Sequence, residues 1–481
     1  MPVIDYESAL AFLLGRVNYE TFRQMPYGEM RQNLGQLKAF LEYLGRPDLR
    51  FPVIHVAGTK GKGSTCAMLA AVFREAGYRV GCFTSPHLHT LNERFAVNGV
   101  PCPNDRLVEI VQYLELQWHV WSGGHSAVET AVGNAVSVAN GVTGKNVCTQ
   151  RELTFFEYSV LVAFEWFARE QVDLAVMETG MGGRFDATNI CEPILCVITG
   201  ISFDHTEQLG NTLAAIAGEK AGIIKPGVPV VSGVVMQKDD DPQAVIRDVA
   251  ARNHAELYEL NREFSIVPHD HGAFDFHWHA SNAGTLNRLT LKLLGRHQRD
   301  NTALALAGVM LLRQRGWNVP DQAVRKALAE LEVPCRIERF RLPNGPAVIL
   351  DGAHNKASAE ALLEALQTFP DMPVGQKILL FGSTLGKDVT GMFETLLPFF
   401  DEIWLSQCTT SPRTVPVDTL LELARKTSCK PQNLVVVATP NEAVEHLHQI
   451  ADKGGLVCVT GSLYFAAEIR ELLIHPNLCG R

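Results

Sequence analysis

A glycine-rich segment with two lysines, residues 58–64, has the residue types best suited to chemistry in this chain. It follows the apolar run 51–57, which we expect to form a buried strand, and precedes 65–76, which we expect to form a helix. Glycines let backbone N–H groups converge on an anion, and the helix dipole adds positive charge at the same place. The segment is therefore predicted to hold the phosphates of a nucleotide, through Gly58, Thr59, Lys60, Gly61, Lys62, Gly63 and Ser64.

Two side chains of this segment have distinct expected roles. Lys62 can reach the β- and γ-phosphates, and Ser64 can face a magnesium ion. The spacing is unusual, because the common P-loop has four residues between its first glycine and its Gly-Lys pair, and only two separate Gly58 from Gly61. A plain tight turn would also use glycines, but strand, lysine and serine together favour nucleotide binding.

Three further segments with hydroxyl, acidic or histidine side chains follow expected strands: 83–88, 178–189 and 204–206. Ligands of open α/β sheets bind at the carboxyl ends of the strands. Magnesium prefers oxygen ligands and accompanies phosphates, so Ser85 and Glu178 are candidate ligands. His205 is a candidate third ligand, and a loop histidine held by hydrogen bonds is the alternative.

Length and composition limit the class of protein. A chain of 481 residues is expected to form two or three domains. Hydrophobic residues make up 46% and charged residues 20%, a balance typical of soluble proteins. The net charge of −9 and the lack of a basic run argue against a nucleic-acid partner.

Other features indicate the compartment. The first residues show no basic, apolar signal-peptide pattern, and no run of about 18 apolar residues predicts a membrane span. Eleven cysteines without a Cys-x-x-Cys pair favour reduced thiols. We therefore expect a cytoplasmic protein with no membrane partner.

The expected elements alternate from residue 51 onward. Residues 1–50 are predicted to be helical, and strand candidates then alternate with helices, which favours a parallel sheet; these candidates are 172–177, 194–199 and 228–231. Residues 119–150 have no clear period and are interpreted as an inserted loop. Residues 260–294 are expected to be strands, in which alternating histidines such as His277 either bind a metal or lie on an exposed strand face.

A domain boundary is expected near Val333-Pro334-Cys335, giving domains 1–334 and 335–481. The second domain alternates again, with strands expected at 347–350, 377–381, 402–405, 434–437 and 456–460. The predicted fold class is α/β: an N-terminal P-loop-type ATPase domain with a mostly parallel sheet, and a smaller Rossmann-like C-terminal domain. The second domain has no lysine-bearing P-loop and is expected to contribute side chains to a cleft.

An ordered set of motifs resembles the folylpolyglutamate synthase/dihydrofolate synthase family, within the Mur ligase superfamily. The resemblance covers nearly the whole chain outside 119–150, and its motifs are 58–64, 83–88, 180–189, 218–225, 295–301, 351–355 and 459–462. It implies an ATP-dependent amide ligase: ATP phosphorylates a pterin-bearing carboxylate, and the amine of L-glutamate displaces phosphate from the acyl phosphate.

The resemblance also implies roles for single residues. It places His354 near the phosphates as a catalytic partner of Lys62, and it makes Ser85, Glu178 and His205 magnesium ligands. Lys220 matches a lysine that the family carries as a carbamate, which would bridge to a second magnesium ion. A salt bridge from Lys220 to nearby acids is the alternative.

Three more positions match nucleotide contacts of the family. Asp351 resembles a ribose contact, Asn301 an adenine-side residue and Arg336 a phosphate contact. Asp and Asn also cap helices, so a helix cap is the alternative for Asp351 and Asn301.

Two departures from the family pattern concern the second domain. The family usually has Pro-Gly-Arg at the domain linker, whereas this chain has Pro334-Cys335-Arg336, which puts the backbone geometry of the hinge in doubt. Gly386 replaces the first acid of an Asp-Lys-Asp region in 381–388. The glutamate-side residues are therefore less well specified than the ATP side.

The expected protein is a monomeric ligase that joins L-glutamate to dihydropteroate, to a reduced folate, or to both. A Mur-type ligase for another carboxylate, a nucleotide-regulated binding protein without turnover and a small P-loop kinase are the alternatives. The set Lys62, Glu178, His205, Lys220 and His354 argues against a non-catalytic protein.

Overall fold

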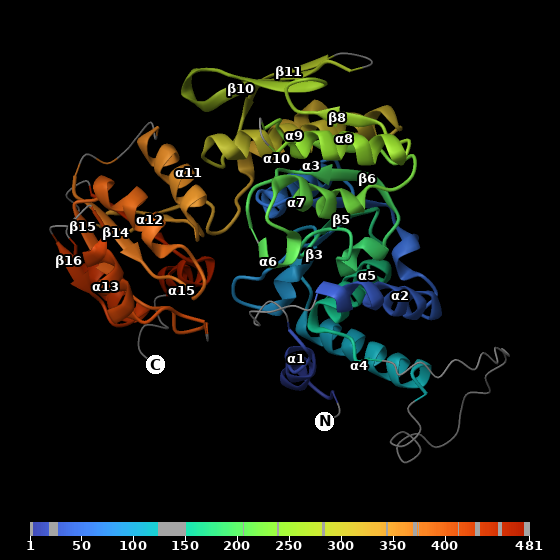
Figure 1. Cartoon of the computed structure of the whole chain (residues 1–481), viewed down its shortest axis with the longest axis horizontal. Helices are drawn as coiled ribbons and strands as arrows, with labels where there is room; N and C mark the ends of the chain where they lie inside the picture. The colour runs from blue at the N-terminus through green and yellow to red at the C-terminus, as the bar shows by residue number, and fades with distance from the viewer. Residues whose placement is uncertain are drawn as a thin grey trace. The chain divides into compact units, whose positions relative to one another are not determined.

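The structure is a computed structural model that describes residues 3–18, 27–123, 151–204, 206–237, 240–280, 284–342, 345–368, 373, 375–411, 413–428, 433–450 and 455–475. It divides into two compact units (Figure 1). The first consists of Met1–His87 and Leu91–Leu260, and the second of Leu88–Thr90 and Asn261–Arg481. Each unit is described by itself.

The first unit is built on an eight-stranded sheet with the order β4-β3-β2-β5-β1-β6-β7-β8. Its strands are β1 (Val53–Ala57), β2 (Val80–Phe83), β3 (Phe95–Val97), β4 (Val100–Pro101), β5 (Leu174–Glu178), β6 (Pro193–Ile198), β7 (Val230–Ser232) and β8 (Leu257–Glu259). The six strands β2, β5, β1, β6, β7 and β8 pair in parallel with their neighbours. Strand β3 pairs antiparallel with β2, and β4 pairs antiparallel with β3. Every residue of β1 and β5 is buried, as expected for central strands covered on both faces.

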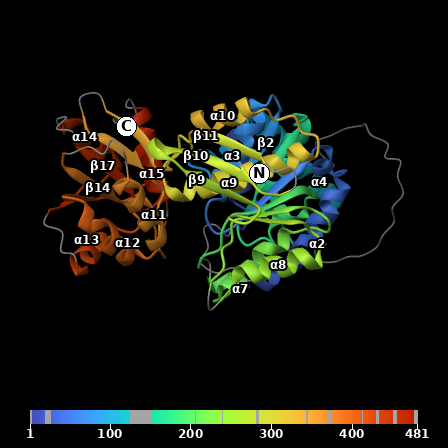
Figure 2. The ribbon, with the colours of Figure 1, turned by 90° about the horizontal axis from the view of Figure 1, so that it is seen from above.

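The helices of this unit are α1 (Tyr6–Leu14), α2 (Tyr27–Tyr43), α3 (Lys62–Glu75), α4 (Asn104–Trp121), α5 (Phe155–Arg169), α6 (Thr206–Leu209), α7 (Leu213–Lys220) and α8 (Pro242–Arg252). Short 3-10 turns are η1 (Pro47–Arg50), η2 (Leu91–Arg94), η3 (Ala187–Ile190) and η4 (Ala221–Ile223). Figure 2 shows α7 and α8 side by side. Helix α3 begins at Lys62, three residues earlier than expected, because Gly61 takes the left-handed conformation (φ 86°) that ends the loop.

The predicted insertion 119–150 begins as a helix. Helix α4 continues to Trp121, because Trp118 extends an apolar stripe that includes Leu107, Ile110 and Leu114 at helical spacing. The expectation of a loop at 119–121 is therefore wrong, and 124–150 lie outside the described residues.

The second unit has a three-stranded sheet, β11-β10-β9, and a six-stranded sheet, β12-β13-β17-β14-β15-β16. The strands are β9 (Phe264–Pro268), β10 (Ala273–Trp278), β11 (Gly284–Thr290), β12 (Glu338–Arg341), β13 (Ala347–Leu350), β14 (Lys377–Phe381), β15 (Glu402–Leu405), β16 (Leu434–Val436) and β17 (Leu456–Thr460). Its helices are α9 (Arg296–Gln314), α10 (Asp321–Glu330), α11 (Lys356–Gln367), α12 (Val389–Leu396), α13 (Val417–Lys426), α14 (Pro440–Gln449) and α15 (Leu463–Ile474), with the turns η5 (Asp270–Gly272) and η6 (Leu397–Phe399).

Alternate residues of the six-stranded sheet enter two different cores. Ile349 and Leu379 pack with α11, α12 and α13, whereas Val348 and Leu380 pack with α14 and α15. Successive side chains of a strand point to opposite faces, so the sheet is covered on both sides. Only β12 pairs antiparallel to its neighbour within this sheet, and the α/β fold class predicted from the sequence is confirmed.

Strand β10 confirms the expected exposed face for the alternating histidines. Phe274, Phe276 and Trp278 are buried, whereas His277 lies on the other face, where its Nδ1 is 3.1 Å from the hydroxyl of Thr285. Among the described residues, no group of three or more His, Cys, Asp or Glu is placed to hold a metal ion. The histidine pattern therefore follows from strand alternation.

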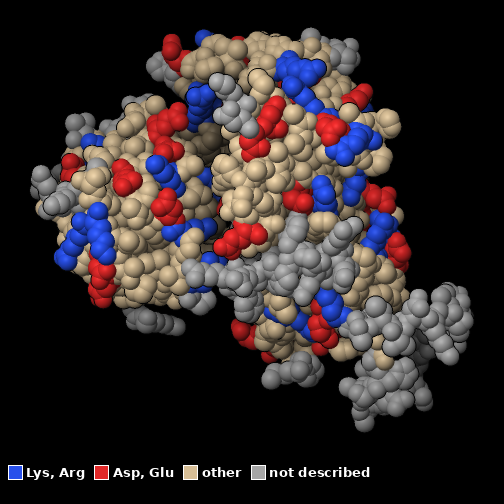
Figure 3. Space-filling view, in the orientation of Figure 1, with Lys and Arg blue, Asp and Glu red and all other residues tan. Residues whose placement is uncertain are grey.

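Charged side chains of both signs are interspersed over the face shown in Figure 3. No helix in the described ranges is long and apolar enough to cross a membrane. The cysteines that the structure describes are free thiols.

The alternation in β10 predicts unequal effects of two neighbouring substitutions. Phe276→Ala should destabilise the second unit by about 3–5 kcal/mol, because it leaves a cavity in the core. His277→Ala should cost about 1 kcal/mol or less, because it removes one hydrogen bond at a partly exposed position. Thermal unfolding of both variants checks this, and equal destabilisation would contradict the observed strand orientation.

Candidate active site

The candidate active-site residues of the first unit meet at the carboxyl edge of the large sheet. Glu178 ends β5 and pairs in register with Val56 of the neighbouring β1. Strand β1 leads into the glycine-rich segment 58–64, the predicted phosphate loop. Ser85 follows β2, on the other side of β5. Parallel pairing brings these strand ends together, as predicted.

The phosphate loop is held by the segment that follows β6. The backbone N–H of Thr59 donates to the carbonyl of Gly200 at 2.8 Å, and the hydroxyl of Thr199 donates to the carbonyl of Lys60 at 2.6 Å. At Gly58, where φ is +151°, a Cβ would stand 1.9 Å from the hydroxyl oxygen of Thr199. Glycine is therefore required at this position by both conformation and space. Thr199 and Gly200 were missed from the sequence, because nothing in their residue types signals contact with a distant loop.

Glu178 faces the start of α3. Its Oε1 lies 3.9 Å from Nζ of Lys62, and its Oε2 accepts a hydrogen bond of 3.1 Å from the backbone N–H of Ser85. Glu178 is buried, and a Cβ on Gly63 would lie 3.5 Å from its Oε2. A buried carboxylate that faces Gly63, the neighbour of Ser64, and is hydrogen-bonded to the backbone of Ser85 gives the kind of oxygen donors that a magnesium ion prefers. These residues fit a divalent cation that accompanies phosphates.

Lys220, the last residue of α7, extends to the phosphate loop. Its Nζ donates to the carbonyl of Gly58 at 2.9 Å, and its side chain is buried. A salt bridge from Lys220 to its neighbour Glu219 is not formed. Lys220 donates to the backbone carbonyl of Gly58, and Oε1 of Glu219 lies 3.9 Å from Nε of Arg184. Burial, and then the charge of Lys62, lower the pKa of Lys220 to about 7.

A buried chain of hydrogen bonds leads from the centre of the sheet to the loop after Glu178. The hydroxyl of Thr188 donates to Oδ1 of Asp186 at 2.5 Å and lies 2.8 Å from Nε2 of His55 on β1. Because the hydroxyl proton is engaged by Asp186, Nε2 of His55 must carry the proton in the other bond. Burial lowers the pKa of His55 to about 3, so the ring is neutral.

Asp186 in turn fixes the glycine-rich loop 180–183. Its Oδ2 accepts from the backbone N–H of Met181 at 2.9 Å. The same loop contacts α7, where the N–H of Arg184 donates to the carbonyl of Glu219 at 2.7 Å. The chain from His55 thus supports the loop between Glu178 and Lys220, and the polar His55 inside an apolar strand was the signal in the sequence.

His205, the predicted third metal ligand, lies outside the described residues. Asp204 is described, and its charge raises the pKa of Lys220, against the larger effect of burial. The segment after β6 therefore brings an acid near Lys220.

Arg336, Asp351 and His354 belong to the second unit. The carboxylate of Asp351 accepts from the backbone N–H groups of Ile337 at 3.0 Å and Ala353 at 2.9 Å. Burial raises its pKa to about 6, and the charge of Arg336 opposes that shift. The cap of α11 is Asn355, so the helix-cap interpretation of Asp351 is wrong and Asp351 instead joins two backbone segments.

His354 and Asn301 have defined neighbours in the same unit. Nδ1 of His354 lies 2.9 Å from the carbonyl of Gly352, which requires the proton on Nδ1. Asn301 lies inside α9, whose cap is Gly295, and its amide donates to the side-chain oxygen of Gln298 at 3.1 Å. The helix-cap interpretation of Asn301 is therefore also wrong.

Both departures from the family pattern have local structural consequences. Cys335, in place of the linker glycine, has a left-handed φ of 55°, a conformation that costs a non-glycine residue roughly 1 kcal/mol or more. Cys335 is buried against Ala466 and Ala467, so packing holds the strained backbone. Gly386 has φ 83°, which suits glycine, and Asp388 caps α12 by accepting from the N–H of Gly391 at 2.9 Å.

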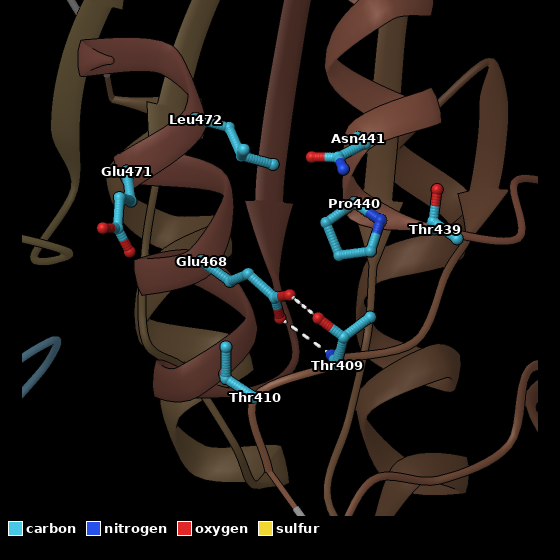
Figure 4. Close-up of a pocket in the computed structure, with 8 residues that line it drawn as sticks. All are labelled: Thr409, Thr410, Thr439, Pro440, Asn441, Glu468, Glu471 and Leu472. Atoms are coloured by element: carbon cyan, nitrogen blue, oxygen red, sulfur yellow. Dashed lines mark hydrogen bonds between the residues drawn. The ribbon is translucent and has the colours of Figure 1, made fainter. Parts of the chain in front are cut away.

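One cavity of about 330 Å³ lies in the second unit, between α15, the start of α14 and the segment after β15 (Figure 4). Glu468 points across it and accepts from the backbone N–H of Thr409 at 2.9 Å and from the hydroxyl of the same residue. None of the predicted site residues lines this cavity.

The contact of Gly58 with Thr199 predicts the effect of a single methyl group. Gly58→Ala should cost about 1–3 kcal/mol in strain and displace the loop, so ATP affinity should fall by about tenfold or more. Gly200→Ala is the matched control, because a Cβ there meets no atom within 4 Å. Calorimetric titration with ATP compares the two, and unchanged affinity of a folded Gly58→Ala protein would contradict the described loop.

Comparison with family models gives two matched regions, the first of which extends past Leu260, where the first compact unit ends. The chain matches the Mur ligase middle domain over residues 122–309 and the Mur ligase glutamate ligase domain over residues 335–463. It is 32% identical over 478 residues to the dihydrofolate synthase/folylpolyglutamate synthase of Bacillus subtilis, covering 97% of this chain and 99% of that relative.

Solved structures agree over the whole chain. Escherichia coli FolC in complex with DHPP and ADP is 28% identical with a TM-score of 0.77, covering 99% of this chain and 100% of the other. A bifunctional folylpolyglutamate synthase/dihydrofolate synthase with Mn, AMPPNP and L-glutamate bound is 25% identical with a TM-score of 0.75, covering 99% of both chains. The chain thus belongs to the folylpolyglutamate synthase/dihydrofolate synthase family of Mur ligases, the ATP-dependent glutamate ligases of folate metabolism.

Proposed function

We propose that this protein is an ATP- and magnesium-dependent ligase that adds L-glutamate to dihydropteroate, to folylpolyglutamate, or to both. The observation that carries the proposal is the convergence of the phosphate loop, Lys62, Glu178 and Lys220 at one edge of the sheet. The names of its relatives, and the ADP and L-glutamate bound in two of the solved structures, support the choice of substrates.

The proposed ligase reaction depends more on neutralising the charge of the phosphates than on a strong base. The substrate carboxylate attacks the γ-phosphorus of ATP, the bond to ADP breaks, and an acyl phosphate forms. The amine of glutamate then attacks the acyl carbon, loses a proton and expels phosphate. Lys62 would neutralise the β- and γ-phosphates, and the loop would align them with the attacking carboxylate.

The proposed magnesium ligands are Ser64, Ser85, Glu178, His205 and a carbamate on Lys220. Bound magnesium would neutralise phosphate charge, and two ions are proposed because the family resemblance implies a second, carbamate-bridged ion. The oxygen-rich surroundings of Glu178 support the first ion.

The second unit is proposed to supply the remaining nucleotide contacts and the second catalytic residue. Asn301 would face the adenine, Asp351 the ribose and Arg336 a phosphate. His354 would act on the acyl phosphate, and the contact of its Nδ1 with the carbonyl of Gly352 orients the ring. We also propose that the functional domain boundary lies at residues 334/335, which the start of the glutamate ligase match at residue 335 supports. A cytoplasmic monomer remains part of the proposal.

The proposed activity predicts that the release of ADP depends on both the acceptor and the amino acid. ADP should be released at steady state only when ATP, magnesium, L-glutamate and a pteroate-type carboxylate are all present. Dihydropteroate and tetrahydrofolate as alternative acceptors, with radiolabelled glutamate, distinguish the two reactions.

The Lys62→Ala variant should turn over about 10²–10³ times more slowly in the same assay, because it lacks the cation proposed to neutralise the phosphates.

The same assay separates the alternatives. ADP release that is equally fast without an acceptor would reject the ligase proposal. Preference for a uridine-linked peptidoglycan precursor would indicate a Mur-type ligase for another carboxylate. No turnover with any acceptor would favour a nucleotide-regulated binding protein.

Carbamylation of Lys220 is proposed from the family resemblance and from the state of its amine. Only a neutral amine combines with carbon dioxide, forming a carbamate and releasing one proton. A pKa near 7 leaves a large share of Lys220 neutral at physiological pH. The carbamate nitrogen keeps one N–H, so the hydrogen bond to the carbonyl of Gly58 can persist while the new oxygens face the metal ions.

Lys220→Ala is therefore expected to be nearly inactive and to regain some activity when acetate is added. A lysine that acted only as a cation holding Gly58 would not be replaced by an anion, so rescue discriminates between the two roles. Lys426→Ala, at an exposed position, is the control and should keep full activity. Full activity of Lys220→Ala without acetate would reject the carbamate.

A further inference from the structure

A second cavity of about 330 Å³ lies in the first unit, away from the phosphate loop. Its lining includes residues 189–192, which directly precede β6, and Lys225, which precedes β7. These are the amino ends of the two strands, whereas the phosphate loop follows the carboxyl end of the adjacent β1. The cavity is therefore at the opposite edge of the sheet from the candidate active site.

Lys225 places an ammonium group beside this cavity without a carboxylate partner. Among the described residues, the Nζ of Lys225 donates a hydrogen bond of 3.0 Å to the backbone carbonyl of Asn189. Partial burial is the main cause that lowers the pKa of Lys225; the charge of Lys38 adds to this shift, whereas Cys191, Cys196 and Glu192 oppose it. A partly buried cation that is paired only with a neutral carbonyl is unfavourable unless a negative charge joins it.

One acid of the lining, Glu192, acts on Lys225 through its charge, which raises the pKa of that lysine, but it forms no ion pair with Lys225 in the described part of the chain. Lys38, on α2, also lines the cavity and forms no ion pair within the described ranges. Glu192 is the acid of the lining, and its carboxylate pairs with Arg46 at 3.1 Å. Arg46 also pairs with Asp48 at 2.8 Å, so the ion pair of Glu192 is with Arg46 and not with a lysine of the cavity.

We propose that this cavity is an anion-binding site, in which Lys38 and Lys225 hold the carboxylate or phosphate group of a small metabolite. Leu34 and Ile190 give the cavity an apolar wall, which suits a short organic anion as well as inorganic phosphate. The site lies beyond the proposed ligase function, because it includes none of the residues assigned to ATP, magnesium or glutamate.

The binding is testable by the reactivity of the lysines in the full-length protein. ADP and magnesium are first added to saturation, so that added anions do not act through the phosphate loop. A limiting amount of an acetylating reagent then labels neutral amines, and peptide mass spectrometry gives the labelling rate of Lys225 relative to exposed Lys426. The probes are inorganic phosphate and succinate, compared with chloride at equal ionic strength.

Either probe is expected to slow the labelling of Lys225 by about tenfold, because a bound anion covers the amine and favours its protonated form. Lys426 should label at the same rate throughout. Protection by phosphate alone or by succinate alone identifies the preferred anion, and both results support the site.

A variant distinguishes two-lysine recognition from a general salt effect. Lys38→Gln, at an exposed helix position, should weaken protection of Lys225 by about tenfold, and Lys426→Gln should leave it unchanged. Equal labelling of Lys225 in phosphate, succinate and chloride would overturn the proposal. Protection that is unaffected by Lys38→Gln would overturn the two-lysine site. Neither readout depends on ligase activity, so failure here is separate from failure of the proposed function.

Discussion

The hydrogen bond from Lys220 to the carbonyl of Gly58 is the interaction on which the candidate active site depends. It joins the end of α7 to the first residue of the phosphate loop, which the sequence separates by more than 150 residues. The ammonium is buried, so the bond forms in a low-dielectric environment where it is strong and its loss is costly. The same side chain holds the loop and is the one for which we propose a carbamate.

Around this bond, the loop is positioned by backbone contacts more than by side chains. Thr59 and Lys60 are tied to the segment after β6, and Gly58 approaches Thr199 more closely than any other residue type would allow. Such contacts leave the side chains of Lys62 and Ser64 available for phosphate and metal. They also show what determines the path of a loop with unusual spacing: it is held by the neighbouring strand end and not by its glycines alone.

The second unit uses a buried carboxylate in a comparable structural role. Asp351 accepts from Ile337 after the linker and from Ala353 beside His354, so one side chain joins the linker to the segment that contains His354. Burial opposes the ionisation of Asp351, and the charge of Arg336 favours it. A ribose contact at Asp351 would therefore be made by a residue that already has structural partners.

The sequence by itself determined the fold class, most strand positions and the chemical types at the candidate site. Strands such as β13, β14 and β17 could be predicted because apolar runs between turn residues are local features of a chain. The motifs 58–64 and 178–189 likewise carry their chemistry in residue type and spacing. Their family followed from the order of several motifs, each of which is short.

Tertiary structure alone decided what each polar group contacts. Lys220 faces Gly58 and not Glu219, Asp351 bonds to Ile337 and caps no helix, and Thr199 supports the phosphate loop. The pairing of His55 with Thr188 and the cation pair Lys38 and Lys225 could not be read from spacing either. The physical reason is that these contacts join residues far apart in the chain, and strand order and helix packing set their distances, whereas local sequence specifies only the element in which each residue lies.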